Sequence, residues 1–337
     1  MLKRLWLRLL AGAAILAVML ALVVAWWLEQ PLPLAADTVE VSIEAGATPR
    51  QVAQAWVDAG VQAPAWALYE WFRWSGQARR IRAGSYEIGR DVSPRALLRK
   101  MVQGDETLAT VRLIEGWTFR QFRAELARAP GLVSESAALT DDALMAALGA
   151  PGQAPEGRFF PDTYAYSKGT SDLSVLMRAH RAMQRRLAAA WAARDPGTPL
   201  RNADEALALA SIVEKETGAA ADRAKVAGVF ANRLRLGMPL QTDPSVIYGL
   251  GERFDGNLRK RDLQADTPYN TYTRAGLPPT PIAMPGQAAL DAALHPAPTP
   301  ALYFVARGDG TSEFSNDLAA HNRAVQQYQR GKPQLPP

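Results

Sequence analysis

The hydrophobic pattern of the chain opens with one long apolar run before it breaks into short strand-like and helical segments. The run covers residues 9–28, LLAGAAILAVMLALVVAWWL, and holds no formal charge. As a helix rising about 1.5 Å per residue, it spans roughly 30 Å, the thickness of the hydrocarbon core of a bilayer. Residues 1–30 are therefore predicted to form a cytoplasmic tip and a transmembrane helix.

Charges flanking this run predict its orientation. Three basic residues precede it, Lys3, Arg4 and Arg8. Only Glu29 follows closely, so the positive-inside rule keeps the N-terminus in the cytoplasm and places the rest of the chain outside. A cleavable signal peptide is the alternative, because Val23 and Ala25 resemble a small-residue cleavage pattern, but the run is longer than a usual signal core.

Beyond a short tether, strand-like segments are each followed by a helix-start signal. Residues 39–43 and 84–88 have the pattern typical of β-strands. Thr48 with Gln51 can cap a helix after the first segment, and Ser93-Pro94 can cap one after the second. Several identities recur at a constant offset of 70 residues: Val41 and Val111, Gly46 and Gly116, Thr48 and Thr118, Arg50 and Arg120, Gln51 and Gln121. These segments predict a small α+β subdomain over 38–108 whose pattern resembles wall-binding LysM modules.

An aromatic-rich stretch within this subdomain has two interpretations. It contains Trp66, Tyr69, Trp71, Phe72 and Trp74. Stacking on sugar faces would be a functional use of these rings, and packing of a small core would be a structural one. Core packing is favoured, because aromatic side chains dominate the burial energy of small domains.

Composition removes several classes of chemistry. The 337 residues include no Cys, which excludes disulfides, Cys-ligated zinc and thiol catalysis. The three histidines, His180, His295 and His321, are scattered, and the chain has no phosphate-binding glycine loop or G-x-S-x-G elbow, so no metal or cofactor is expected. The net charge is +5, of which residues 1–30 hold +2, and no basic stripe for nucleic acid follows in the rest of the chain.

The segment 205–217, EALALASIVEKET, is the strongest candidate for chemistry. On a helix, Glu216 follows Ile212 by four residues and Val213 by three, so its carboxyl group lies at the end of an apolar stripe. Partial desolvation there raises the pKa and keeps the group protonated, as a general acid requires. The alternative is a solvated last helical turn. Glu214 is expected to point away from the stripe.

Longer motifs around this helix resemble a known family. They are EGRFFPDTY at 156–164, ALASIVEKETG at 208–218, VFANRLRLGMPLQTDPSVIYGLG at 229–251, YNTYTRAGLPPTPIAMPG at 269–286 and HPAPTPALYFVA at 295–306. Together they resemble the endolytic murein transglycosylases of the MltG, or YceG-like, family. The resemblance implies a single-pass enzyme of the inner membrane. Its periplasmic, mixed α+β catalytic domain, residues 109–337, would cut nascent peptidoglycan strands.

The resemblance also implies how the site works. The catalytic acid of the family is the second glutamate of E-K-E-T, which is Glu216 here. In a lytic transglycosylase the C6 hydroxyl of muramic acid attacks C1 and closes a 1,6-anhydro ring, so a single acid suffices. The motifs supply candidate substrate-binding residues: Gln241, Thr242, Asp243, Tyr248, Asn270 and Tyr272. The implied partners are glycan strands, the membrane and peptidoglycan synthases.

Three alternatives remain beside this interpretation. Asp243 as a second catalytic carboxylate would favour ordinary hydrolysis by water. A noncatalytic wall-binding scaffold would use the LysM-like region alone, and the polar motif residues would then only stabilise turns. A lyase using pyridoxal phosphate would need a Schiff-base lysine and a soluble chain, which the apolar N-terminus disfavours.

Overall fold

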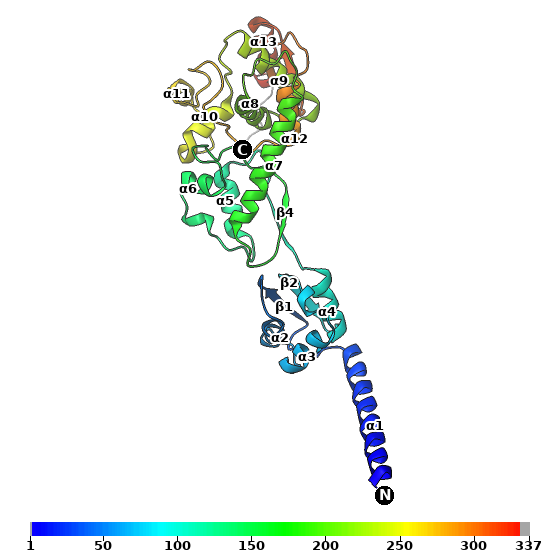
Figure 1. Cartoon of the computed structure of the whole chain (residues 1–337). Helices are drawn as coiled ribbons and strands as arrows, with labels where there is room; N and C mark the ends of the chain where they lie inside the picture. Colours follow the sequence, from blue (N-terminus) through cyan, green and yellow to red (C-terminus); the bar gives the residue numbers. More distant parts are fainter. Residues whose placement is uncertain (1, 331–337) are drawn as a thin grey trace. The chain divides into compact units, whose positions relative to one another are not determined.

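The computed structural model describes residues 2–330, which form two compact units, each containing both helices and strands (Figure 1). The first unit comprises residues 2–109 with 165–170, and the second comprises 110–164 with 171–330. The short segment 165–170 joins the first unit, which the sequence pattern did not indicate. The predicted mixed α+β class is confirmed.

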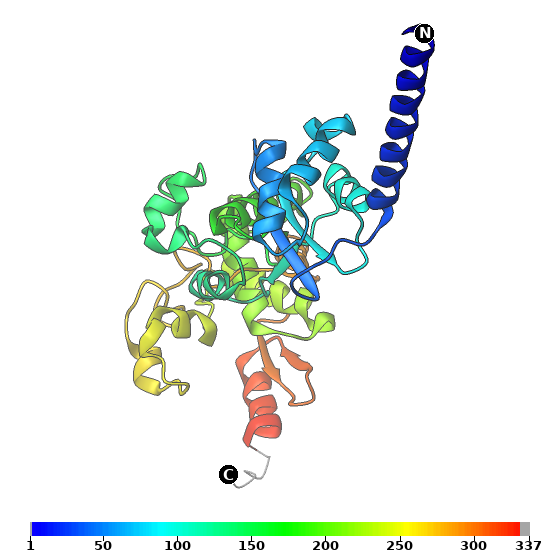
Figure 2. The same cartoon turned by 90° about the horizontal axis from the view of Figure 1, so that it is seen from below.

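The chain begins with α1 (Leu2–Glu29), a single uninterrupted helix (Figures 1 and 2). Its segment Leu10–Glu29 is long and apolar enough to cross a membrane. Large apolar side chains along it are exposed, among them Leu16, Leu20 and Trp26. By length and composition, this helix suits either a membrane anchor or a signal sequence.

The rest of the first unit has the order strand, helix, helix, strand, helix. These elements are β1 (Thr38–Ile43), α2 (Pro49–Asp58), α3 (Ala65–Trp74), β2 (Gly84–Gly89) and α4 (Pro94–Gln103). β1 and β2 pair antiparallel, with Thr38 opposite Gly89 and Ile43 opposite Gly84. Ser93 caps α4 as predicted, and the helix ends at Gly104 in the left-handed conformation. The likeness to LysM modules stays a prediction.

The repeated template of the sequence corresponds to repeated local structure. Thr48 caps α2 and Thr118 caps α5 (Phe119–Arg128), each in a capping box with the glutamine three residues later. The turn before each cap holds a glycine at positive φ, 84° at Gly46 and 75° at Gly116, where other residues would be strained. A glycine turn leading into a capped helix therefore occurs twice.

The aromatic residues of α3 divide between core and surface. Phe72 is fully buried together with Leu68, and two further rings pack against this core, Tyr69 and Trp71. Trp66 and Trp74 are instead 71% and 77% exposed. The core-packing interpretation is thus confirmed for Phe72 and wrong for Trp66 and Trp74, because only one face of the amphipathic helix meets the core.

The second unit is mainly helical. After α5 its helices are α6 (Asp141–Ala147), α7 (Asp172–Ala192), α8 (Ala203–Glu216), α9 (Ala220–Arg235), α10 (Asp243–Leu250), α11 (Lys260–Gln264), α12 (Gln287–Leu294) and α13 (Leu318–Val325). Two short strand pairs accompany them: β3 (Ala109–Arg112) with β4 (Thr163–Tyr166), and β5 (Tyr303–Ala306) with β6 (Ser312–Ser315).

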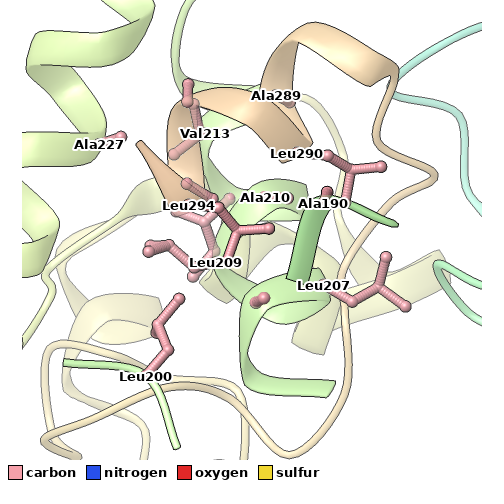
Figure 3. Close-up of a cluster of buried hydrophobic side chains, with 14 of the residues drawn as sticks. Ala190, Leu200, Leu207, Leu209, Ala210, Val213, Ala227, Ala289, Leu290 and Leu294 are labelled. Atoms are coloured by element: carbon pink, nitrogen blue, oxygen red, sulfur yellow. The ribbon is translucent and has the colours of Figure 1, made fainter. Parts of the chain in front are cut away.

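The core of the second unit surrounds α8. Every residue from 206 to 213 is buried, so this helix is surrounded by protein on all sides except at its ends. Figure 3 shows Leu209 and Val213 of α8 among side chains of α12 such as Leu290 and Leu294. Helices α7, α9 and α12 all contact α8. The end of α8 is therefore held rigidly by packing.

Candidate active site

Helix α8 presents the predicted acid at its C-terminal end. The Asn202 side chain caps the start of the helix by accepting the Glu205 N–H at 2.9 Å. Glu216 is the last helical residue and is partly buried. The predicted apolar stripe is confirmed, because Ile212 and Val213 are fully buried. The backbone below the Glu216 carboxyl group is thus fixed by the core.

The surroundings of Glu216 favour its protonated form. Burial raises the pKa of the Glu216 carboxyl group, and the negative charge of Asp243 adds to this effect. The Thr242 hydroxyl and the positive charge of Arg233 lower this pKa, but the net shift is still upward. The buried Thr242 hydroxyl has no hydrogen bond of ordinary geometry among the described residues, so it remains available to Glu216 or to a bound sugar. A solvated turn at Glu216 is therefore the wrong interpretation.

A strained turn lies beside the acid, at residues 241–245. Gln241 has a φ of 52° and is the one non-glycine residue with positive φ between residues 2 and 330. Its N–H donates to the Thr271 carbonyl at 3.0 Å, and the Thr242 N–H donates to Thr271 Oγ1 at 3.0 Å. Ser245 Oγ donates to the Thr242 carbonyl at 2.8 Å. Strain of this kind persists where surrounding bonds hold it, typically at functional sites.

Arg233 places a buried cation near the acid, and the sequence analysis missed it. The side chain of this α9 residue donates to the Leu302 carbonyl at 2.7 Å and to the Leu240 carbonyl at 2.8 Å. Burial lowers the pKa of the Arg233 guanidinium, while the charge of Glu216 acts to raise it. Arginine nevertheless stays charged in proteins. The only sequence signal was the position of Arg233 inside the motif at 229–251.

Asp243 and Tyr272 meet at the same site. The Tyr272 hydroxyl donates to Asp243 Oδ1 at 2.6 Å. Burial and the charges of Asp243 and Glu216 raise the pKa of Tyr272, so the phenol stays protonated. Asp243 itself is exposed at the start of α10, where the helix dipole favours a carboxylate. The structure thus gathers five groups at one site: Glu216, Arg233, Thr242, Asp243 and Tyr272.

Asn270 has a different environment from the other predicted site residues. Its buried amide donates to the carbonyls of Leu263 and Ala265 at 3.0 and 2.7 Å and accepts the Tyr272 N–H at 2.8 Å. These bonds shape the loop that carries Thr271 and Tyr272. The geometry favours a positioning role for Asn270 over direct contact with substrate.

Tyr248 faces a second buried carboxyl group, Glu156. Its hydroxyl donates to Glu156 Oε2 at 3.1 Å, and its ring packs edge-on against Tyr269 at 4.9 Å between ring centres. Glu156 is 6% exposed and accepts the Phe119 N–H at 3.0 and 3.2 Å. Burial raises the pKa of Glu156 to about 7 despite these bonds. Sequence reasoning gave Glu156 no role, although it begins the EGRFFPDTY motif.

Glu214 links two helices. Its Oε2 accepts the N–H of Gly286, the residue that precedes α12, at 2.9 Å. Burial raises the pKa of Glu214, and the negative charge of Glu115 raises it further. The hydrogen bond from Gly286 lowers this pKa without cancelling the rise. Glu214 therefore holds α12 against α8 and does not lie in a solvated turn.

The site is built from carboxyl, hydroxyl, amide and guanidinium groups. Within residues 2–330, no cluster of three or more His, Cys, Asp or Glu side chains is arranged to hold a metal ion. Two of the histidines pack against rings, His180 on Phe159 and His321 on Tyr303.

Comparison with known proteins decides the family. The profile of the YceG-like family matches residues 41–327, which include the end of the first strand, the whole of α8 and the strained turn. The chain belongs to the YceG-like family. The resemblance inferred from the motifs is thereby confirmed.

Two relatives and one solved structure show how far the similarity extends. The chain is 39% identical over 173 residues to an endolytic murein transglycosylase of Bacillus subtilis, covering 51% of this chain and 48% of that protein. It is 29% identical over 287 residues to an endolytic murein transglycosylase of Streptococcus pneumoniae, covering 75% of this chain and 51% of the relative. The chain thus spans about half the length of these relatives. The crystal structure of a YceG-like protein from Listeria monocytogenes superposes with a TM-score of 0.53 at 27% identity, over 86% of this chain and 99% of that one.

Proposed function

We propose that this chain is an endolytic lytic transglycosylase of peptidoglycan. It cleaves the MurNAc–GlcNAc β-1,4 bond of nascent glycan strands, leaves a 1,6-anhydro-MurNAc end and thereby ends strand elongation. The observation that carries the proposal is the partly buried Glu216, whose pKa is raised and which lies beside a strained turn and a buried cation. The names of the relatives, endolytic murein transglycosylases, support the same reaction class.

Glu216 acts twice in this reaction. As an acid it protonates the glycosidic oxygen while the bond from C1 of MurNAc to that oxygen breaks. The C6 hydroxyl of the same MurNAc attacks C1, and the Glu216 carboxylate accepts the hydroxyl proton. One C–O bond breaks and one forms, no water is consumed, and the acid is restored. The attack is intramolecular, which gives the nucleophile a large effective concentration.

The neighbours of Glu216 suit both of its protonation states. Burial and the charge of Asp243 favour the acid needed for the first proton transfer. Arg233 and Thr242 favour the carboxylate, which exists between the two transfers. A group balanced in this way can donate and then accept a proton without a large energetic bias against either step.

The remaining predicted residues divide into three roles. Gln241, Thr242 and Tyr272 contact the sugar, and Asp243, held by Tyr272, tunes the pKa of Glu216. Two further residues position the site through other groups, Tyr248 through Glu156 and Asn270 through backbone carbonyls.

The N-terminal helix supports the location that we propose for the enzyme. Helix α1 within residues 1–30 spans the inner membrane with the N-terminus in the cytoplasm, and the LysM-like subdomain 38–108 and catalytic domain 109–337 lie in the periplasm. The apolar length of α1 and the basic residues before it support this topology. Glycan strands are the substrate there, and peptidoglycan synthases are candidate partners.

Substitution of the two glutamates of E-K-E tests the proposal. With the full-length chain in detergent micelles and uncrosslinked glycan strands, we expect Glu216→Gln to slow bond cleavage by about 10²–10⁴-fold, as for loss of a general acid. Glu214→Gln is the matched control, because Gln can still accept the Gly286 N–H, and it should keep activity within a few-fold. Equal activity of Glu216→Gln and the parent chain would refute the assignment.

A further inference from the structure

Two tryptophans on α3 take no part in the proposed reaction. Trp66 and Trp74 are 71% and 77% exposed, although indole rings are usually buried or in contact with a partner. They are eight residues apart, which on a helix places them about 80° apart around the axis. Glu70 lies one turn from each, and the Trp74 Nε1–H donates to it at 2.9 Å. The two rings therefore form one exposed aromatic face, defined here as Trp66, Glu70 and Trp74.

The membrane-facing helix ends inside the core of the same unit. Leu28 of α1 is 5% exposed, and Leu32, just beyond the helix, is 2% exposed. The Leu32 N–H donates to the Val92 carbonyl at 2.9 Å, and Arg95 of α4 pairs with Glu29 at 2.9 Å. The first unit is thus attached to the end of α1 through packed contacts and not through a flexible linker.

The segment before α3 and one side chain within α3 are hydrogen-bonded to residues next to this junction. The Gln62 N–H, just before α3, donates to the Pro33 carbonyl at 2.8 Å. The Trp71 Nε1–H, near the end of α3, donates at 3.1 Å to the carbonyl of Pro94, the neighbour of Arg95. Figure 1 shows α3 on the side of the first unit from which α1 departs. Helix α3 therefore lies at the level where α1 ends.

We propose that the exposed aromatic face of α3 inserts into the headgroup region of the bilayer that α1 spans. This inference rests on α1 being a transmembrane helix. Tryptophan prefers the membrane interface, because its ring is apolar and its N–H is polar. Trp26 of α1 is 64% exposed and lies near the same end of that helix, so in the proposed arrangement it belongs to the same interfacial belt. The Glu70 carboxylate of this face pairs with Arg73 at 3.0 Å, so the face brings no unpaired negative charge toward the lipid phosphates.

The absence of cysteine allows a direct test by site-specific labelling. Trp66→Cys and Trp74→Cys each create a unique thiol in the full-length chain, which carries a nitroxide after labelling. Ala45→Cys is the control, because Ala45 is exposed beyond the far end of β1. That strand starts at Thr38 next to the tether, so its far end, which Ala45 follows, lies about 20 Å from the tether. All three variants alter exposed side chains and leave the core intact.

The labelled chains are reconstituted in nanodiscs of phosphatidylethanolamine and phosphatidylglycerol, and collision with a water-soluble nickel complex is measured by electron paramagnetic resonance. We expect labels at 66 and 74 to be at least threefold less accessible to nickel than the label at 45, and more accessible to oxygen. Equal nickel accessibility at all three positions would overturn the proposal. A chain that separates from the discs during gel filtration would contradict the transmembrane α1 and overturn the proposal with it. Neither result depends on glycan cleavage, so the proposed activity is tested separately.

Discussion

Glu216 lies between groups that favour opposite protonation states. Burial and Asp243 favour the neutral acid, and Arg233 favours the anion. Arg233 cannot move away easily, because its guanidinium is committed to backbone carbonyls on two segments. The protonation of one carboxyl group is therefore set by neighbours that the fold holds in place, which is how active sites tune an acid near its working pH.

Replacement of Asp243 tests this balance. In the proposed reaction, cleavage needs protonated Glu216, so we expect kcat/KM to fall as the pH rises through the pKa of Glu216. Asp243→Asn removes a negative charge that raises this pKa, and the alkaline limb of the pH profile should move to lower pH. At low pH we expect activity within about tenfold of the parent chain, since no proton-transfer group is lost. A loss above about 100-fold at every pH would instead identify Asp243 as a second catalytic carboxylate.

Glu156 should make the stability of the second unit depend on pH. Its pKa is about 7 in the folded chain and about 4.5 when unfolded, so the folded state binds the proton more tightly. Preferential protonation of Glu156 in the folded state adds roughly 3 kcal/mol to the free energy of unfolding. This contribution is complete below about pH 4.5 and is lost as the pH rises to about 7. Glu156→Gln should remove this part of the pH dependence, as measured by urea unfolding between pH 4.5 and 7.5. Parallel curves for the two proteins would show that Glu156 does not titrate in this range.

At the scale of elements, local chemistry explains the helix starts. Each capping box pairs Thr with Gln three residues later and satisfies backbone N–H groups that the helix itself leaves free. Both turns that precede them need glycine for their positive φ. These signals act over fewer than ten residues, so they could be recognised without any knowledge of tertiary packing.

The two capping boxes provide a matched pair of variants. Thr48→Ala and Thr118→Ala each remove the side-chain acceptor, and each should lower the free energy of unfolding by about 1 kcal/mol. Thr→Ser at the same positions keeps the hydroxyl and should lower the free energy of unfolding by only a few tenths of that amount. Thermal unfolding followed by circular dichroism measures both. An Ala variant as stable as its Ser counterpart would mean that the cap contributes nothing at that helix.

At the scale of the whole molecule, the site depends on contacts that no local signal predicts. The acid and its apolar stripe were predictable because both lie on one helix. Arg233 and Thr271 were missed, because they reach Glu216 and the Gln241 turn only when α9 and the loop before α12 pack around α8. The role of Glu156 likewise depends on Tyr248, which is 92 residues away in the chain.

The exposed tryptophans of α3 show the same limit. Sequence reasoning could identify an aromatic-rich helix, but which rings face the core depends on how α3 packs against its neighbours. Phe72 lies on the buried face, whereas Trp66 and Trp74 do not. The composition of the stretch therefore could not separate core packing from a surface function.

Mass analysis of the strand ends tests the central claim most directly. The full-length chain is incubated with uncrosslinked glycan strands, and the new ends are identified. Because the nucleophile is the C6 hydroxyl of the substrate, the account predicts 1,6-anhydro-MurNAc ends on internal fragments, each lighter by one water than a reducing end, and predicts their loss with Glu216→Gln. Reducing ends as the main product would show that water attacks C1 and would contradict the account.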